Sequence, residues 1–179
     1  MSSESNSNIV EQFADSAREV MATVERIKTT PELLSDAILA ASKGEFIILA
    51  QPNDINPDLF AVLKENSTVV TQPAKEQISS IRIGVTDAFC AIASTGSVCV
   101  SVSNNLSSPI SMLARTHIVV VASNAIIPKP RNLFSKDYLD GKGLQRSFSI
   151  ITGPSATADM GPLVRGVHGP GKLHIIILE

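Results

Sequence analysis

The chain of 179 residues contains no tryptophan and only two cysteines, Cys90 and Cys99, nine positions apart. A conventional iron–sulfur cluster needs four cysteine thiolates, and a disulfide-stabilised fold needs several cysteine pairs, so both are excluded. Both cysteines lie within apolar runs, and we expect them to be small core residues. If this protein takes part in electron transfer, a partner protein must carry the redox centre.

Basic runs, aromatic clusters and long apolar stretches are also missing. Aromatic residues make up 4% of the chain and the net charge is −2, which argues against a nucleic-acid-binding face. No apolar run approaches the roughly 18–20 residues that cross a bilayer. The polar segment 1–8 (MSSESNSN) has no signal-peptide pattern, and its composition predicts disorder. The sequence therefore predicts a cytoplasmic protein without a membrane span or a nucleic-acid partner.

Signatures of metal and cofactor sites are absent as well. No pair of His, Cys or acidic residues has a zinc-ligand spacing such as H-x-x-x-H, and there is no P-loop, G-x-S-x-G or complete G-x-G-x-x-G. We therefore expect neither a metal nor a cofactor. His117 opens one predicted strand and His174 lies within another, so we expect both of these histidines to be structural.

The residues that are abundant favour an α/β fold. With few aromatic side chains, the core must be built from Ile, Val, Leu and Ala, which suits the buried strands of a parallel sheet. The predicted strands are 22–27, 46–50, 67–71, 82–85, 98–102, 117–122, 148–152 and 173–178. The predicted helices are 9–21, 30–43, 57–64, 87–93, 110–114 and 133–140. This alternation predicts one domain, 9–179, with three α/β/α layers and a mainly parallel sheet.

Two loops rich in glycine and hydroxyl groups follow predicted extended or apolar segments. The first, Thr95-Gly96-Ser97, is typical of turns that bind anions through backbone N–H groups. The second begins with Gly153-Pro154-Ser155 and continues to Thr157 and Asp159. Because ligands of open α/β sheets bind at the carboxyl ends of strands, we expect both loops to line one cleft. A tight turn and an ordinary helix cap are the simpler explanations of the two loops.

A third candidate, His168, lies between glycines in the segment Gly166-Val167-His168-Gly169-Pro170. An imidazole in such a loop can bind an anion or carry a proton, and the alternative is a hydrogen bond to the backbone alone. We expect Asp159 to accept backbone N–H bonds as a structural clamp rather than to act as a general base. Arg165 is the nearest basic residue in sequence and would give a bidentate contact if it turned inward. Such a lining complements a small anion.

Two blocks of the sequence, 84–97 (GVTDAFCAIASTGS) and 151–178 (ITGPSATADMGPLVRGVHGPGKLHIIIL), resemble the LUD domain. The pairing of A-I-A-x-T-G with G-P-S-x-T-A-D and G-V-H-G-P carries this resemblance, and it brings Thr86 into one block with Thr95 and Gly96. The family usually has an acidic residue where this chain has Ser94. That departure bears on any family chemistry that needs a carboxylate there.

The resemblance implies the fold shared by ribose-5-phosphate isomerase, glucosamine-6-phosphate deaminase and CoA transferases. It also implies a non-redox subunit of an iron–sulfur complex that oxidises L-lactate to pyruvate, beside cluster-bearing subunits of lactate utilisation. We expect such a subunit not to be catalytic alone. The alternative is an independent binding protein or enzyme for a small phosphorylated or acyl metabolite. The missing cysteines and the missing acid at Ser94 favour the first hypothesis.

Overall fold

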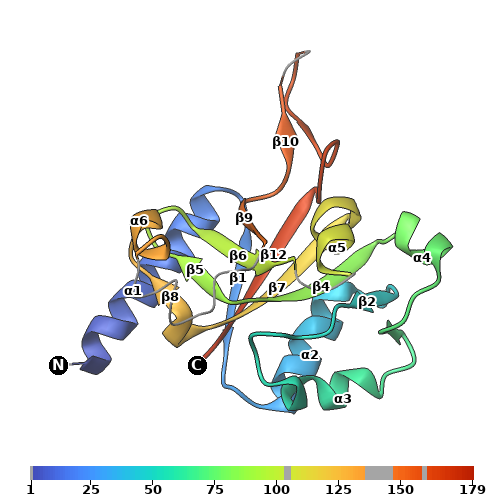
Figure 1. Cartoon of the computed structure of the whole chain (residues 1–179), viewed down its shortest axis with the longest axis horizontal. Coiled ribbons are helices and arrows are strands. Elements are labelled where there is room, and N and C mark those ends of the chain that lie inside the picture. Colours follow the sequence, from blue (N-terminus) through green and yellow to red (C-terminus); the bar gives the residue numbers. More distant parts are fainter. Residues whose placement is uncertain (1, 103–105, 136–146, 159–160) are drawn as a thin grey trace.

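The computed structural model describes residues 2–102, 106–135, 147–158 and 161–179 (Figure 1). Within these residues, a six-stranded parallel sheet forms the centre of the molecule, in the order β1-β12-β7-β4-β2-β3. Its strands are β1 Thr23–Ile27, β12 Lys172–Leu178, β7 Thr116–Ala122, β4 Ile83–Ala88, β2 Ile47–Leu49 and β3 Val69–Val70. The central strands are apolar on both faces, as expected for a parallel sheet that is covered on both sides. We refer to it as the large sheet.

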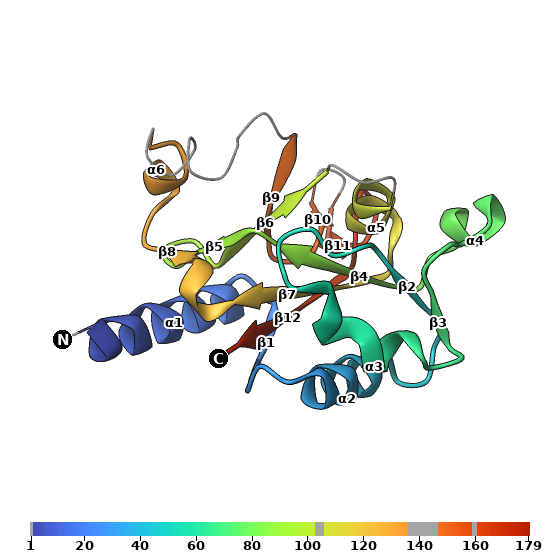
Figure 2. The same cartoon turned by 60° about the horizontal axis from the view of Figure 1, so that its bottom comes forward.

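Among the described residues, one face of the large sheet is covered mainly by helices. Alternate residues of β7 and β12, among them Val120 and Ile176, pack there against helix α2 (Pro31–Ser42) and against η1 and α3 (Pro57–Phe60 and Ala61–Lys64). Helix α2 begins where the sequence predicts, because the Thr30 hydroxyl accepts a hydrogen bond from the Leu33 N–H at 3.3 Å. Figure 2 shows these helices below the sheet.

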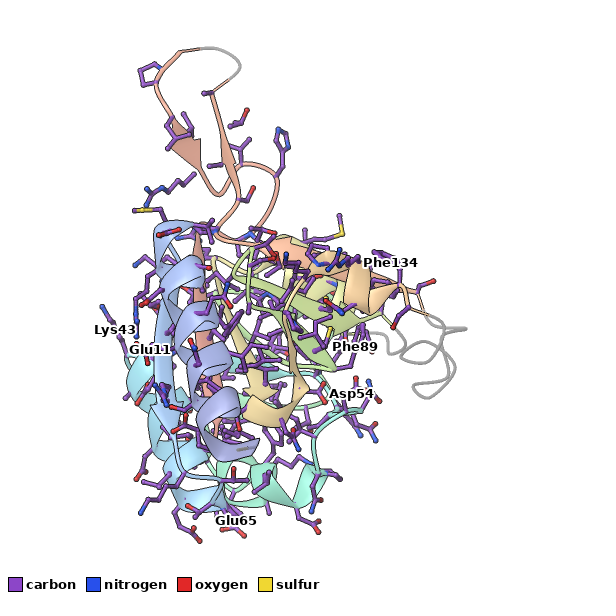
Figure 3. The ribbon with its side chains drawn as sticks, turned by 90° about the vertical axis from the view of Figure 1, so that its left-hand side faces the viewer. Glu11, Lys43, Asp54, Glu65, Phe89 and Phe134 are labelled. Atoms are coloured by element: carbon purple, nitrogen blue, oxygen red, sulfur yellow. The ribbon has the colours of Figure 1, made fainter. Side chains whose placement is uncertain are left out.

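The opposite face carries helix α1 (Ser2–Glu19), α5 (Ser107–Leu113) and a second, smaller sheet. The small sheet has the order β8-β5-β6-β9, with strands β8 Ile126–Ile127, β5 Cys90–Ile92, β6 Ser97–Ser101 and β9 Phe148–Thr152. It lies above the large sheet in Figure 2. At one end of it, Phe148 packs edge-on against Phe89, with ring centroids 5.4 Å apart, and also lies beside Phe134. Phe89 and Phe134 are labelled in Figure 3. The three-layer α/β architecture is therefore confirmed, with a mainly parallel sheet.

An arm formed by residues 153–158 and 161–170 projects from this body (Figures 1 and 3). Its described part contains the short antiparallel pair β10 (Ala156–Thr157) and β11 (Val164–Arg165). Three large apolar side chains on it are exposed: Leu163, Val164 and Val167. The sequence does not predict this pair of strands, which are only two residues long.

Several predicted elements need correction. The segment 87–93 is not a helix: β4 runs to Ala88, the chain bends at Phe89, and β5 continues into the small sheet. Because all of its residues are buried, its apolar pattern has no periodicity that separates helix from strand. Helix α1 begins at Ser2, earlier than the predicted start at residue 9.

Smaller differences concern the remaining short elements. The strand predicted at 67–71 is reduced to β3, and a short helix α4 (Lys75–Ser79) follows it. Most of the helix predicted at 133–140 lies outside the described residues, which include a short helix α6 (Pro130–Leu133) just before it. A 3₁₀ turn, η2 (Ser123–Ala125), connects β7 to β8. None of the helices in the described part of the chain has the length and hydropathy that a bilayer span requires.

Candidate functional site

A cavity of about 380 Å³ lies where the arm joins the body. The arm contributes residues 153–156 and 168–170 to its wall, and the preceding end of β9 contributes 150–152. His117 and Leu173, paired at the starts of β7 and β12, and Ser111 of α5 complete the lining. The volume is at the lower end of the range of about 300–1,000 Å³ that is usual for small-molecule sites.

The cavity does not lie where the sequence predicts a ligand site, at the carboxyl ends of the parallel strands. Gly153 does follow the carboxyl end of β9, but β9 belongs to the small sheet. With respect to the large sheet, the cavity lies at the amino ends of β7 and β12, because His117 and Leu173 are near the start of their strands. The expected site at the carboxyl ends of the parallel strands is therefore wrong for these loops.

The carboxyl ends of β2 and β4 are closed by an internal contact. The buried Asp87 carboxylate accepts backbone N–H bonds from Asn53, Asp54 and Ile55 at 2.8, 2.6 and 3.0 Å. Burial raises the pKa of Asp87, and the three N–H donors act in the opposite direction. This carboxylate fixes the loop after β2, and it is not among the residues that line the cavity.

The arm is closed at its base by contacts between the two halves of the second family block. The Ser155 N–H donates to the Pro170 carbonyl at 2.8 Å, and the Gly166 N–H donates to the Ser155 carbonyl at 2.9 Å. A side chain at Gly169 would place its Cβ 3.1 Å from that of Ser155, which is a tight contact that Ser155 would have to relieve by a small shift. The structure thus brings Gly153, Pro154 and Ser155 together with His168 and Gly169 in one wall, as the sequence predicts.

The other predicted loop lies beside the cavity without lining it. Thr95 Oγ1 is 2.7 Å from Ser97 Oγ, which is 2.8 Å from Thr152 Oγ1 in the cavity wall. Gly96 has a φ of +63°, and a Cβ there would meet the backbone of Ala17 in α1. The expectation that Thr95, Gly96 and Ser97 line the same cleft is therefore wrong, because their hydroxyls bond to one another and their glycine packs on a helix.

The remaining candidates are placed as follows. Thr86 is buried on β4 and contacts the lining residue His117, Thr157 lies in β10 outside the lining, and Arg165 is exposed on β11. Asp159 lies outside the described residues, so its expected role as a clamp stays a prediction. Arg165 does not turn into the cavity.

His117, for which the sequence predicts a structural role, is part of the cavity lining. Its side chain is fully buried, its Nε2 lies 2.8 Å from Thr86 Oγ1, and its buried Nδ1 has no hydrogen-bond partner among the residues that the structure describes. Burial lowers the pKa of His117 to about 3, so the imidazole is neutral at physiological pH. The signal in the sequence was a histidine followed only by apolar residues in a buried strand.

The chemistry of the lining suits an oxygen acceptor. Among the described residues, no carboxylate lines the cavity, whereas Ser155 and His168 present side chains that form no hydrogen bond with the rest of the described chain. Hydroxyl and N–H donors of this kind complement carboxylate or phosphate oxygens. Nor do the described residues contain a group of three or more His, Cys, Asp or Glu side chains that fits a metal ion.

Comparison with known proteins identifies the family. The LUD domain matches residues 10–178. The chain belongs to the LUD domain family. The match covers both the cavity and the arm, so the resemblance drawn from two blocks of sequence extends to nearly the whole chain.

Within the LUD family, the chain is similar to several curated proteins named lactate utilization protein C. It is 31% identical to the one from Bacillus licheniformis over 108 residues, which are 58% of this chain and 45% of that protein. It is 30% identical to the Bacillus subtilis protein over 101 residues, 54% of this chain and 42% of that protein. The chain thus spans about half the length of these relatives. A longer match, 28% over 171 residues, covers 85% of this chain and 71% of the Geobacillus kaustophilus protein.

A solved structure supports the fold. The chain superposes on a DUF162 family protein from Deinococcus radiodurans with a TM-score of 0.68 and 20% sequence identity. The superposition covers 97% of this chain and 98% of the other, so it includes both sheets.

Proposed function

We propose that this LUD domain acts in lactate utilisation as a component without a redox centre, and that its cavity binds a small anionic metabolite. The similarity to lactate utilization protein C, which extends over 85% of the chain in the G. kaustophilus match, supports the process. Oxidation of L-lactate to pyruvate then requires partner subunits that carry iron–sulfur clusters.

The two cysteines support the absence of a redox centre. Cys90 and Cys99 are both buried and lie directly opposite each other on β5 and β6. The pKa of the Cys99 thiol is raised by its hydrogen bond with Cys90 and by burial. The thiol therefore stays protonated, whereas a metal ion binds the thiolate, and burial keeps a metal ion from reaching it.

One observation supports a ligand in the cavity. The cavity lies where the second family block folds back on itself, and its lining offers the unpaired side-chain donors of Ser155 and His168 and no described carboxylate. Its wall joins Ser155 and His168 with the neutral His117, while Ile150, Ile151 and Leu173 supply an apolar surface. This combination fits a short metabolite with oxygen acceptors and a small carbon skeleton.

Deletion of the gene in the source organism tests the process. We expect the deletion strain to lose growth on L-lactate but not on a fermentable sugar, and to recover it with the intact gene. The tagged full-length protein, purified from lactate-grown cells, should bring down iron–sulfur proteins that mass spectrometry identifies. Normal growth of the deletion strain on L-lactate, without co-purifying cluster proteins, would overturn the proposal.

A further inference from the structure

The outer strands of the described sheets differ in how they are protected against pairing with another chain. An outer strand presents a row of unpaired N–H and C=O groups, and natural proteins protect it with charges, with a covering element or by keeping it short. In the large sheet, β1 carries the exposed charges Glu25 and Arg26, and β3 has only two residues. The two strands of the arm are equally short. In the small sheet, β8 is buried and packs against α1, above which it lies in Figure 2.

Strand β9, the other outer strand of the small sheet, has none of these protections among the described residues. It is five residues long, and its sequence, FSIIT, contains neither a charge nor a proline. Its burial is incomplete, since Ile150 is 43% exposed and Thr152 is exposed as well. A strand with these properties is a template for pairing with another chain.

The pairing of β9 with β6 shows which of its backbone groups are free. The Val102 N–H donates to the Ser147 carbonyl at 2.9 Å, and bonded and non-bonded pairs alternate along an antiparallel ladder. Ser149 and Ile151 therefore direct their backbone groups towards β6. The alternate residues direct theirs away from β6, and no hydrogen-bond partner for these groups occurs in the described part of the chain: Phe148, Ile150 and Thr152.

These free groups are arranged symmetrically about Ile150. When two copies of β9 lie antiparallel around a two-fold axis at Ile150, this residue faces its own copy, and Phe148 faces Thr152 of the second copy. Each facing pair then exchanges two N–H···O bonds. The exposed Ile150 side chains pack against each other, and a strand without charges does not repel its copy.

The two ends of β9 are also complementary to each other. At its start, Phe148 lies beside Phe134, whose side chain is exposed. At its end, the chain enters the arm, which exposes Leu163, Val164 and Val167. Antiparallel pairing places the end of one β9 beside the start of the other, so each arm leaves its body on the side where the second copy exposes Phe134. A two-fold interface requires a self-complementary surface of this kind.

We propose that the protein forms a symmetric dimer in which β9 of one copy pairs antiparallel with β9 of the other, centred on Ile150. The two small sheets then become one continuous sheet, and the free backbone groups of both outer strands are paired. Residues 150–152 also line the cavity, so the second copy borders the cavity of the first.

Sedimentation velocity of the full chain, measured without ligand over a range of concentrations, tests the dimer. We expect a species of twice the chain mass of 19.0 kDa. Ile150→Lys and Ile150→Glu each place like charges opposite one another and should sediment as monomers. Mixed in equal amounts, the two variants should form a dimer again, because lysine then faces glutamate across the two-fold axis.

Two further variants separate the strand edge from general effects. Val62→Lys, at an exposed apolar position of α3, is the matched control and should remain a dimer. Ile150→Pro removes an outward N–H and no hydrogen bond to β6, so it should sediment as a monomer with the circular dichroism spectrum of the unmodified protein. If Ile150→Pro does not fold, the two charge variants still decide the result.

The outcomes are distinguishable. An unmodified protein that is monomeric at every concentration overturns the dimer, whether β9 stays free or another protein covers it. A dimer that persists in both charge variants overturns the role of β9, and monomeric variants that do not combine when mixed overturn the register centred on Ile150. None of these measurements involves a ligand, so they leave the proposed anion site untouched.

Discussion

Ser97 and Thr152 are paired across β6 and β9, and their hydroxyl oxygens lie 2.8 Å apart. This contact joins the two family blocks, because Ser97 ends the T-G-S turn and Thr152 immediately precedes Gly153. Thr152 lines the cavity and Ser97 does not. The first block therefore acts on the cavity by holding the end of β9, rather than by contacting a ligand.

Gly153→Ala should destabilise the protein by more than the cost of its backbone conformation alone. Gly153 has a φ of +65°, and a Cβ at this position would meet the carbonyl oxygen of Val20 at the end of α1. Left-handed backbone at a residue with a Cβ costs roughly 1–2 kcal/mol, and the steric contact adds to it. Urea unfolding followed by circular dichroism measures the loss.

Gly44→Ala is the matched control for that variant. Gly44 has a φ of +80°, and a Cβ there would meet nothing within 4 Å, so this substitution measures the backbone cost alone. Equal losses of stability in the two variants would show that the contact between β9 and α1 is not tight.

Asp87→Ala should lower the free energy of unfolding by at least about 2 kcal/mol, because three buried or partly buried N–H groups lose their acceptor. Asp36→Ala, at an exposed position of α2, should change it by less than about 0.5 kcal/mol. Denaturant titration of both variants at pH 7 gives the comparison. A loss below 1 kcal/mol for Asp87→Ala would mean that the loop after β2 is held by other contacts.

Acid should destabilise the protein through His117. The pKa of His117 is about 3 in the folded state, against an ordinary value of 6.5, so the unfolded state takes up a proton that the folded state excludes. Stability from this group is complete above pH 6.5 and falls as the pH drops from about 6.5 towards 3, by about 1 kcal/mol between pH 6.5 and 5.5. Unfolding free energies at pH 7.5, 6.5 and 5.5 measure the slope.

The variant T86V/H117F serves as the reference for the acid effect, because it retains His174 and every acidic residue of the unmodified chain. Its stability should fall less over the same interval. If both proteins lose the same free energy, His117 is not the group that links stability to pH.

The isolated chain should be colourless and should not oxidise L-lactate, because its two buried cysteines cannot bind a four-thiolate cluster. A visible absorption spectrum and an iron determination on freshly purified protein check this. Stoichiometric iron or flavin in protein purified alone would contradict the assignment of a component without a redox centre.

The sequence predicts best those elements whose boundaries are determined locally. The apolar run of β7 identifies a buried strand by itself, and the Thr30 cap with the Lys43-Gly44 stop delimits α2. It predicts poorly which strands pair. The segment around Phe89 is buried on all sides, so its pattern does not distinguish a helix from the observed passage of the chain between two sheets.

The same limit applies to the site. The resemblance to the LUD domain places the Gly-Pro-Ser and G-V-H-G-P segments in one block, and the structure brings them together at the base of the arm. The importance of His117 depends on Thr86, a residue 31 positions earlier on the neighbouring strand. Only the register of β4 against β7 makes that contact visible, and register is a property of the folded sheet.

Ser155→Ala and His168→Ala should each weaken pyruvate binding by about three- to tenfold, the value of one hydrogen bond, and leave the unfolding free energy nearly unchanged. The reason is that neither side chain forms a hydrogen bond within the described residues, while both line the cavity. Ser79→Ala, on the exposed surface of α4, is the control and should not change binding. Calorimetry with pyruvate and urea unfolding of each variant separate the two effects. If both cavity variants unfold the protein, or bind pyruvate as tightly as the control, the arm has a structural role and the ligand site lies elsewhere.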